Sequence, residues 1–223
     1  MTGERFKREK VPLWKKVEGM KTALDVSTKE ARRVPELEAA HKELEEHATT
    51  DSLTELLNRR GLFTYSEAAI NRADHTGNPL AVLYMDLDGF KRINDTYGHS
   101  NGDLALKETA RIIKQHIRLG DIASRLGGDE FVILLENTTE SGAADRAENI
   151  RNSLMARSVK TKKGVFQLKP SIGIAIRDDH QTMDELMSEA DAAMYSEKKK
   201  NKAPIRKRKR TDELTRDLFD NER

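Results

Sequence analysis

Two adjacent glycines, Gly127 and Gly128, lie between two short apolar-rich runs at residues 121–124 and 131–135. Runs of this length are typical of strands, and glycine is the residue that accepts the positive φ of a tight hairpin turn. The pattern therefore predicts a β-hairpin that turns at the two glycines. Such a hairpin makes the two runs neighbours in an antiparallel sheet.

Two carboxylates, Asp129 and Glu130, follow the glycines and are expected at this turn. Adjacent carboxylates contribute little to the stability of a hairpin, whereas they suit a divalent cation or a metal-bound phosphate. A solvated acidic turn is the plain alternative, because short turn-rich motifs recur by chance. The turn alone leaves a metal site and a structural turn open.

A second acidic pattern follows the apolar run at residues 80–85, which predicts a buried central strand. Alternation along a strand puts Asp86 and Asp88 on one face, with Leu87 on the other. Carboxylates at the carboxyl end of a core strand, directly before a helix, are typical of metal and phosphate sites. We expect Asp86 to belong to such a site and Asp88 to cap the following helix.

The rest of this region alternates strand-like and helix-like patterns, which argues for an α/β fold. Helices are predicted at residues 51–73, 90–97, 101–118, 141–155 and 183–200. Further strands are predicted at residues 164–168 and 171–177. Pro170 implies the start of a strand or an edge strand, because proline cannot donate to the ladder.

Several motifs occur in order: DSLTELLNRR from Asp51, DLDGFKRIND from Asp86, YGH from Tyr97, GD from Gly102, RLGGDEF from Arg125, SIGIA from Ser171, ADAAMY from Ala190, then Lys198. In type and spacing they resemble the GGDEF family of diguanylate cyclases, the bacterial enzymes that make cyclic di-GMP from two GTP molecules. Glu55 and Leu57 depart from the commoner Gly and Pro of the first motif.

The resemblance covers roughly residues 49–205 and implies the palm-like fold of class III nucleotidyl cyclases. That fold has a central, mostly antiparallel five-stranded sheet flanked by helices. Residues 1–48 are then a charged extension, with a short signalling helix at residues 35–47. Residues 206–223 form a basic and then mixed-charge tail.

The reaction implied by the resemblance is attack of a ribose 3′-hydroxyl on the α-phosphorus of another GTP, which expels pyrophosphate. Asp86, the Leu87 carbonyl, Asp129 and Glu130 match the family's metal ligands, and Glu130 also matches a position assigned to activating the hydroxyl. Oxygen ligands without His or Cys suit Mg²⁺ or Mn²⁺. Lys91 follows the strand end and is expected near the β- or γ-phosphate.

Other positions match the family's contacts to the nucleotide. Asn94 and Asp103 match its guanine readers, since a carboxylate accepts from guanine N1–H and N2–H. Asp103 thereby favours GTP over ATP. The remaining matches are Phe90, His99, Gly127, Gly128, Lys198 and Lys202. Lys198 also suits a solvated basic run, and His99 is as readily structural as catalytic.

The motif Arg118-Leu-Gly-Asp121 is separated from Gly127 by five residues and resembles the family's allosteric site for the product. A planar guanidinium suits both guanine edges and phosphate, and Asp121 can accept from guanine. The family's further arginine falls at Asn149, with Arg151 nearby. Product inhibition through Arg118 and Asp121 is therefore predicted.

Composition sets further limits on the chain. With 40 basic and 38 acidic residues it is not a polycation, and the absence of cysteine excludes disulfides and thiolate metal sites. No apolar stretch approaches the ~18–20 residues of a membrane span, so a cytoplasmic protein is expected. The basic run at residues 198–210 reads as a solvated tail, with contact to nucleic acid or membrane as the alternative.

One GTP site per chain implies an active homodimer, because a cyclic dinucleotide needs two facing GTP molecules. The favoured function is an active diguanylate cyclase. One alternative is a weakly active or inactive domain that binds cyclic di-GMP through Arg118 and Asp121. Another is a cyclase that also accepts ATP, against which Asp103 argues.

Overall fold

The computed structural model describes residue 18 and residues 48–202, except for the side chains of residues 201 and 202. The helix predicted at residues 35–47 and the tail at 206–223 lie outside the described residues. The chain divides into two units, Met1–Thr49 and Thr50–Arg223. The second unit contains every strand that the structure describes.

The central sheet contains four strands in the order β2-β3-β1-β6, and all its pairings are antiparallel. They are β1 (Leu80–Leu87), β2 (Ile122–Gly127), β3 (Glu130–Glu136) and β6 (Pro170–Ile176). A separate two-stranded hairpin consists of β4 (Ser158–Thr161) and β5 (Gly164–Gln167). The α/β class and the antiparallel sheet are confirmed. The expected five-stranded core is wrong for the described residues, and β4 was not predicted.

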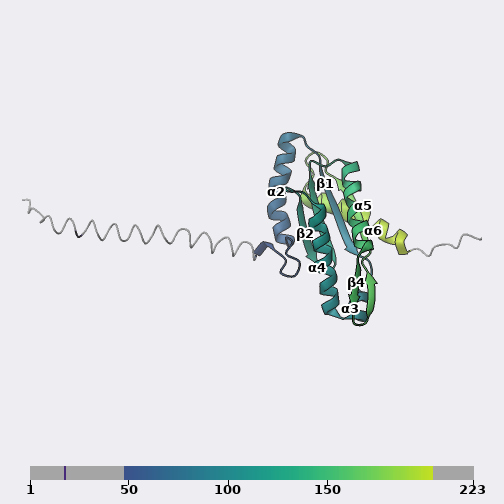
Figure 1. Cartoon of the computed structure of the whole chain (residues 1–223). Helices are drawn as coiled ribbons and strands as arrows, with labels where there is room; N and C mark the ends of the chain where they lie inside the picture. The colour runs from purple at the N-terminus through teal and green to yellow at the C-terminus, as the bar shows by residue number, and fades with distance from the viewer. Residues whose placement is uncertain (1–17, 19–47, 203–223) are drawn as a thin grey trace, which may run out of the picture. The chain divides into compact units, whose positions relative to one another are not determined.

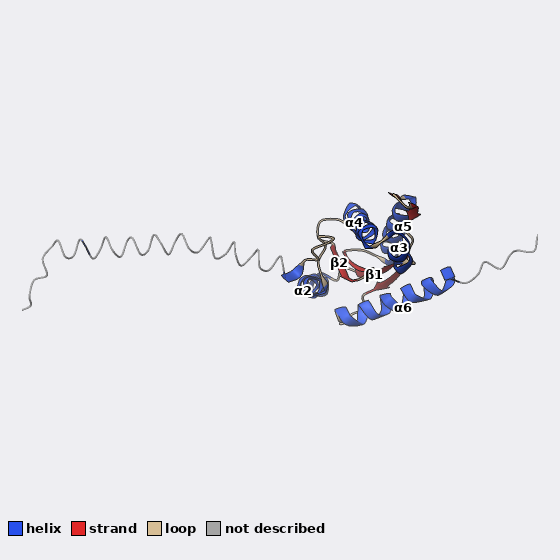
Figure 2. Ribbon diagram, turned by 90° about the horizontal axis from the view of Figure 1, so that it is seen from below, coloured by secondary structure: helices blue, strands red, loops and turns tan. Residues whose placement is uncertain are grey.

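Helices cover both faces of this sheet (Figure 1). They are α2 (Arg59–Thr76), α3 (Phe90–Tyr97), α4 (His99–His116), α5 (Glu140–Ala156) and α6 (Met183–Lys202). Figure 2 shows α4 and α5 on one face and α2 and α6 on the other. In the described part of the chain, no helix combines the length and apolarity that a membrane span needs.

Both faces of β1 are buried, which explains why its sequence is continuously apolar. Leu83 and Met85 belong to the core with α4 and α5, whereas Val82 and Tyr84 belong to the core with α2 and α6. Since side chains alternate along a strand, Asp86 continues the Val82–Tyr84 series and lies on the α2 and α6 face. One buried series of side chains on β1 therefore ends in the Asp86 carboxylate.

The first predicted helix begins eight residues later than expected, at Arg59 instead of residue 51. Residues before it form a turn, in which the Asp51 carboxylate accepts from Thr54 N at 2.9 Å and from Thr54 Oγ1 at 2.5 Å. Asn58 then caps α2 by accepting from Gly61 N. Short polar side chains that bond nearby backbone compete with helix formation, and this outweighed the apolar pattern.

Two other boundary predictions have clear outcomes. Pro170 is the first residue of β6, an edge strand of the four-stranded sheet, as its missing N–H required. The helix predicted at residues 101–118 is α4, which begins two residues earlier at His99 and ends at His116. Gly98, with φ of +91°, separates α3 from α4.

Candidate active site

The predicted hairpin is confirmed: Gly127 pairs with Glu130, and the chain turns between β2 and β3. Gly127 and Gly128 have φ of +151° and +54°, which a side chain would oppose. The Arg125 guanidinium donates to the Gly128 carbonyl at 2.8 and 3.0 Å and also to both oxygens of Asp51. The turn is therefore fastened to the segment that precedes α2.

The same turn is joined to the end of β1. Leu87 N donates to the Asp129 carbonyl at 3.3 Å, and Asp86 lies opposite Glu130 in the β1–β3 register. Three carboxylates from two distant segments thus gather where the central strands β1 and β3 meet the hairpin turn. They are Asp86, Asp129 and Glu130. We call these three residues the acidic edge.

Burial and like charge act together at the acidic edge. Burial, followed by the charge of Asp86, raises the pKa of Asp129. Burial raises the pKa of Glu130 too, and the charges of Asp86, Asp129 and Asp191 add to this against a hydrogen bond from Tyr84. Such crowding of like charges costs free energy and favours binding of a cation.

The negative charge of the acidic edge also raises the pKa of two neighbouring side chains. Burial, with Glu130 and Asp191 nearby, raises the pKa of Tyr84 to about 12. Lys198, from α6, places Nζ 2.5 Å from Asp86 Oδ1. Burial alone would lower the pKa of Lys198, but the hydrogen bond and charge of Asp86 raise it. Lys198 is thus the counter-ion of Asp86 in this structure.

The acidic edge fits a hard divalent cation by its chemistry, because it offers carboxylate oxygens and the end of a strand with backbone carbonyls. Asp86, Leu87, Asp129 and Glu130 are the residues that would hold Mg²⁺ or Mn²⁺. Among the residues described here, no three acidic, histidine or cysteine side chains are already arranged to enclose an ion. Lys198 already contacts one of these carboxylates, Asp86, at 2.5 Å.

The cap predicted for Asp88 is wrong. The N-cap of α3 is Gly89, with φ of +74° and no side-chain hydrogen bond. Both Asp88 oxygens instead accept from Ser171 Oγ at 3.0 Å, across the β1–β6 pairing. Asp88 therefore connects two strand ends, which only their tertiary pairing could reveal.

The two predicted guanine readers lie close together on α3 and α4. A Cβ built on Gly102 would come within 1.8 Å of Asn94 Oδ1 and 3.4 Å of Phe90 Cζ. The Asn94 amide therefore lies directly on the α4 backbone, beside Asp103. Asp103 is exposed, and neither Asn94 nor Asp103 has a side-chain hydrogen bond to another described residue.

The other predicted nucleotide contacts come from the starts of these helices and from α6. Phe90 and Lys91 begin α3, and His99 begins α4. Lys91 and His99 are exposed, and their side chains form no hydrogen bond or ion pair with the described residues. Lys202 is the last residue of α6, and its side chain is not described.

The β4–β5 hairpin supports the end of α3, which sequence reasoning missed. The rings of Tyr97 and Phe166 lie 4.9 Å apart, and Tyr97 Oη donates to the Val165 carbonyl at 3.5 Å. Lys163 Nζ donates to the Thr96 carbonyl at 3.5 Å. An aromatic residue in each segment was the available signal, although nothing in the sequence pairs them.

The Arg118–Asp121 motif forms a tight loop between α4 and β2. Asp121 Oδ2 accepts from Arg118 N at 2.7 Å, and Asp121 Oδ1 accepts from Glu136 N at 3.2 Å. Arg146 lies 3.6 Å away, and the Asp121 side chain is only 4% exposed. The carboxylate is thus engaged within the fold, while Arg118 is exposed.

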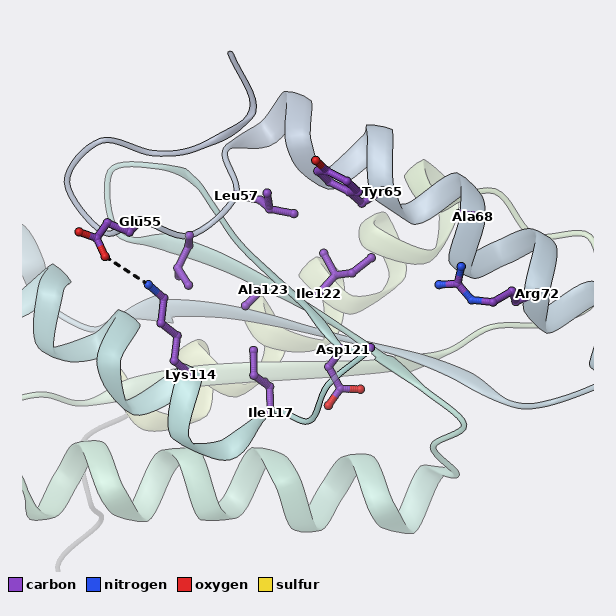
Figure 3. A pocket seen from close by; sticks show the side chains of 12 residues that line it. Glu55, Leu57, Tyr65, Ala68, Arg72, Lys114, Ile117, Asp121, Ile122 and Ala123 are labelled. Atoms are coloured by element: carbon purple, nitrogen blue, oxygen red, sulfur yellow. Dashed lines mark ion pairs between the residues drawn. The ribbon is translucent and has the colours of Figure 1, made fainter. Parts of the chain in front are cut away.

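Arg151, the arginine expected to lie near the predicted product site, is engaged by two carboxylates. Arg151 pairs with Glu148 at 2.7 Å and with Glu197 at 2.8 Å. Beside the loop, a pocket of about 460 Å³ lies between α2 and the end of α4 (Figure 3). Tyr65, Ile117 and Ile122 are among its lining residues, and no residue of the acidic edge is.

The chain is similar to several known proteins. The chain is 44% identical over 163 residues to MucR of Pseudomonas aeruginosa, a bifunctional diguanylate cyclase/cyclic di-GMP phosphodiesterase, covering 73% of this chain and 24% of the relative. It is 39% identical over 153 residues to the diguanylate cyclase DosC of Escherichia coli, covering 68% and 33%. The chain therefore spans a quarter to a third of these relatives.

A solved structure of the coiled coil and GGDEF domain of DgcB from Caulobacter crescentus, in complex with c-di-GMP, superposes with a TM-score of 0.73. It is 29% identical and covers 81% of this chain and 95% of that one. The family described as "Diguanylate cyclase, GGDEF domain" matches residues 48–204. That match takes in the hairpin, the acidic edge and α6, and the chain belongs to the GGDEF-domain family of diguanylate cyclases.

Proposed function

We propose that this protein is a diguanylate cyclase that condenses two GTP molecules into cyclic di-GMP and releases two pyrophosphates. The observation that carries the proposal is the gathering of Asp86, Asp129 and Glu130 at one edge of the sheet. The guanine readers Asn94 and Asp103, side by side on α3 and α4, support the same substrate. Relatives named as diguanylate cyclases add weight to it.

In the proposed reaction, each new bond joins O3′ of one GTP to Pα of the other. Each bond that breaks joins Pα to the oxygen that bridges to the β-phosphate. Glu130 accepts the proton of the 3′-hydroxyl, a role that suits a carboxylate whose pKa is raised by burial and neighbouring charge. Bound Mg²⁺ or Mn²⁺ would supply charge neutralisation at the triphosphate.

Two lysines are proposed to hold the phosphates. Lys91 is exposed at the start of α3, where the backbone N–H groups of a helix terminus also favour anions. Lys198 would exchange its contact with Asp86 for the β- or γ-phosphate of the substrate. This exchange frees the Asp86 oxygen for a metal ion as the triphosphate arrives. Binding of the metal and binding of the nucleotide therefore favour each other.

The proposed active form is a homodimer, because each chain supplies one acidic edge and one pair of guanine readers. Two chains must face each other across a two-fold axis to bring each 3′-hydroxyl to the other α-phosphorus. Specific activity should therefore rise with enzyme concentration in the micromolar range. Activity that stays constant on dilution, in a sample shown to be monomeric, contradicts this form.

Product inhibition at Arg118 and Asp121 is a second proposal. The exposed Arg118 guanidinium favours it, since it is available to guanine or phosphate. Asp121 would need to exchange contacts with Arg118 N or Arg146 for contacts with the product. Calorimetry with cyclic di-GMP tests this directly, and absence of binding would exclude it.

The decisive experiment incubates the purified protein with GTP and Mg²⁺ and identifies the product by mass spectrometry. Formation of cyclic di-GMP and pyrophosphate is expected, with no product from ATP alone. Omission of divalent metal and the Asp129→Asn variant are the controls. Binding of cyclic di-GMP without synthesis would favour the effector function, and a mixed dinucleotide from GTP and ATP would favour relaxed base choice.

A further inference from the structure

Gly102 has the least room of the glycines near the candidate nucleotide site. A Cβ at this position would overlap Asn94 Oδ1 at 1.8 Å and Asn94 Cγ at 2.9 Å. Real Cβ atoms do not approach other heavy atoms this closely, so a side chain at Gly102 must displace the Asn94 amide. The backbone of Gly102 itself is helical and does not require glycine for its conformation.

The closest contacts that glycine permits here are therefore those with Asn94. Helix interiors normally favour alanine over glycine, because glycine loses more backbone entropy on folding. Keeping glycine here costs helix stability, and the close approach of the Asn94 amide is what it permits. Phe90 packs on the same spot, with Cζ 3.4 Å from the hypothetical Cβ, which is an ordinary contact distance.

The amide that rests on Gly102 remains available to a ligand. Asn94 is partly exposed, and its side chain makes no hydrogen bond within the described part of the chain. Two other contacts hold α3 in place: Gly98 N donates to the Asn94 carbonyl at 2.8 Å, and Tyr97 packs on Phe166 of β5. The helix is thus held at its end, while the Asn94 amide has no hydrogen-bond partner among the described residues.

We propose that Gly102 is a positioning residue for base selectivity, because it lets the Asn94 amide lie against α4 next to Asp103. Asn94 and Asp103 then form a preassembled pair that reads the guanine base, and the affinity for GTP depends on this fit. The proposal rests on the proposed function, since it concerns the same nucleotide site. Gly102 acts through Asn94 and does not touch the substrate.

The test measures binding of 3′-deoxy-GTP and 3′-deoxy-ATP by calorimetry with Mg²⁺, since neither nucleotide can react without a 3′-hydroxyl. The full chain is compared with Gly102→Ala, Asn94→Ala and the double variant. Gly102→Ala should weaken 3′-deoxy-GTP binding about tenfold, the value of one good hydrogen-bonding group, and leave 3′-deoxy-ATP binding unchanged. In the Asn94→Ala background the same substitution should have less than about a twofold effect.

Gly142→Ala is the matched control, because Gly142 is also helical but lies in α5 against Thr138 and Thr139. It should bind both nucleotides as wild type does. Melting temperatures provide a second measurement. Alanine at position 102 should raise the melting temperature in the Asn94→Ala background, where the clash is absent, and should not raise it in the wild-type background.

The outcomes separate the inference from the proposed function. Wild-type protein that binds neither nucleotide, or both equally, contradicts the proposed function itself. Wild type that prefers 3′-deoxy-GTP, with a Gly102→Ala variant that prefers it equally, overturns only the inference about Gly102. If Gly102→Ala fails to fold, recovery of folding in the double variant supports the inference, and failure of both overturns it.

Discussion

Two carboxylate-rich regions of this domain use the same side chains in opposite ways. In the turn before α2, Asp51 accepts from Thr54 N, Thr54 Oγ1 and Arg125. Although burial opposes the charge, these hydrogen bonds lower the pKa of Asp51. At the acidic edge, burial and like charge raise the pKa of Asp129 and of Glu130.

Some carboxylates of this domain therefore stabilise the fold, whereas others stay available to bind a cation. Asp51 is saturated by donors and contributes free energy to folding, whereas the acidic edge is held at a cost that a bound cation would relieve. Asp121, buried and bonded to Arg118 N and Glu136 N, resembles Asp51 more than the acidic edge. The donors that surround each carboxylate thus distinguish the two uses.

The largest effect is expected at the acidic edge. Asp129→Asn should reduce cyclic di-GMP synthesis by at least about 10²-fold, because a preorganised charge that stabilises the transition state is lost. Its melting temperature should equal or exceed that of wild type, since the substitution removes a repelling charge. Product formation and thermal melting measure the two effects.

Asp145→Asn is the control for this experiment, because Asp145 is an exposed aspartate on α5. It should change neither activity nor melting temperature appreciably. An Asp129→Asn variant that keeps near-normal turnover removes the metal-site assignment. A variant that melts well below wild type instead assigns Asp129 to the stabilising class with Asp51.

The opposite result is expected at Asp51. Asp51→Ala should lower the free energy of unfolding by about 2 kcal/mol, because it removes a charged pair and leaves donors of Thr54 and Arg125 unsatisfied. At a temperature low enough for the variant to be folded, it should retain cyclic di-GMP synthesis, since Asp51 lies outside the acidic edge. Denaturant unfolding, together with initial rates, tests both parts.

The pH dependence of the Asp51→Ala effect sharpens this assignment. A carboxylate whose pKa is lowered in the folded state stabilises the protein above the pKa of the unfolded chain, ~3.9 for Asp. That contribution is lost as the pH falls through the lowered folded-state pKa. The difference in unfolding free energy between wild type and variant should therefore be constant near pH 7 and shrink below about pH 4. A difference that grows in acid contradicts it.

Substitutions of Arg118 and of Asp121 should have different effects on stability, although the two residues share one motif. Asp121→Ala should lower the free energy of unfolding by about 1–2 kcal/mol, because its buried carboxylate satisfies two backbone donors. Arg118→Ala should change stability by less than about 0.5 kcal/mol and leave the initial velocity intact. It should abolish inhibition by accumulated product. Equal stability of the two variants would place Asp121 with the available carboxylates.

The smallest effect is expected at Glu55, in the turn that holds Asp51. Glu55 has φ of +56°, a conformation that costs a non-glycine residue free energy. Glu55→Gly should raise the free energy of unfolding by about 0.5 kcal/mol, the strain relieved less the entropy that glycine loses. The Glu55–Lys114 pair, at 3.7 Å with Glu55 84% exposed, should offset little of this. A Lys114→Ala control tests that last point.

Much of the acidic edge was predictable, because its two halves are local patterns. The glycine pair predicted the hairpin, and the apolar run ending at Asp86 predicted the buried strand. Their meeting was implied only by resemblance to the family, and the β1–β3 register now provides its physical basis. The function of the individual residues stays a prediction.

Predictions failed where long-range pairing decides what a polar side chain does. Asp88 has the sequence context of a helix cap, yet Ser171 from a strand 83 positions away takes both its oxygens. In the turn before α2, the local bonds from Thr54 already oppose the predicted helix, and Asp51 is also bonded to Arg125, 74 positions later. Neither partner can be inferred from local spacing.

The amino-acid sequence by itself determined the elements, the hairpin turn and the residue types that carry the chemistry. These depend on interactions within a few residues: glycine φ, strand alternation and helix periodicity. Tertiary structure decided which carboxylates are saturated and which are left crowded. That outcome depends on donors such as Arg125, Ser171 and Lys198, which reach Asp51, Asp88 and Asp86 only after the sheet and α6 have packed.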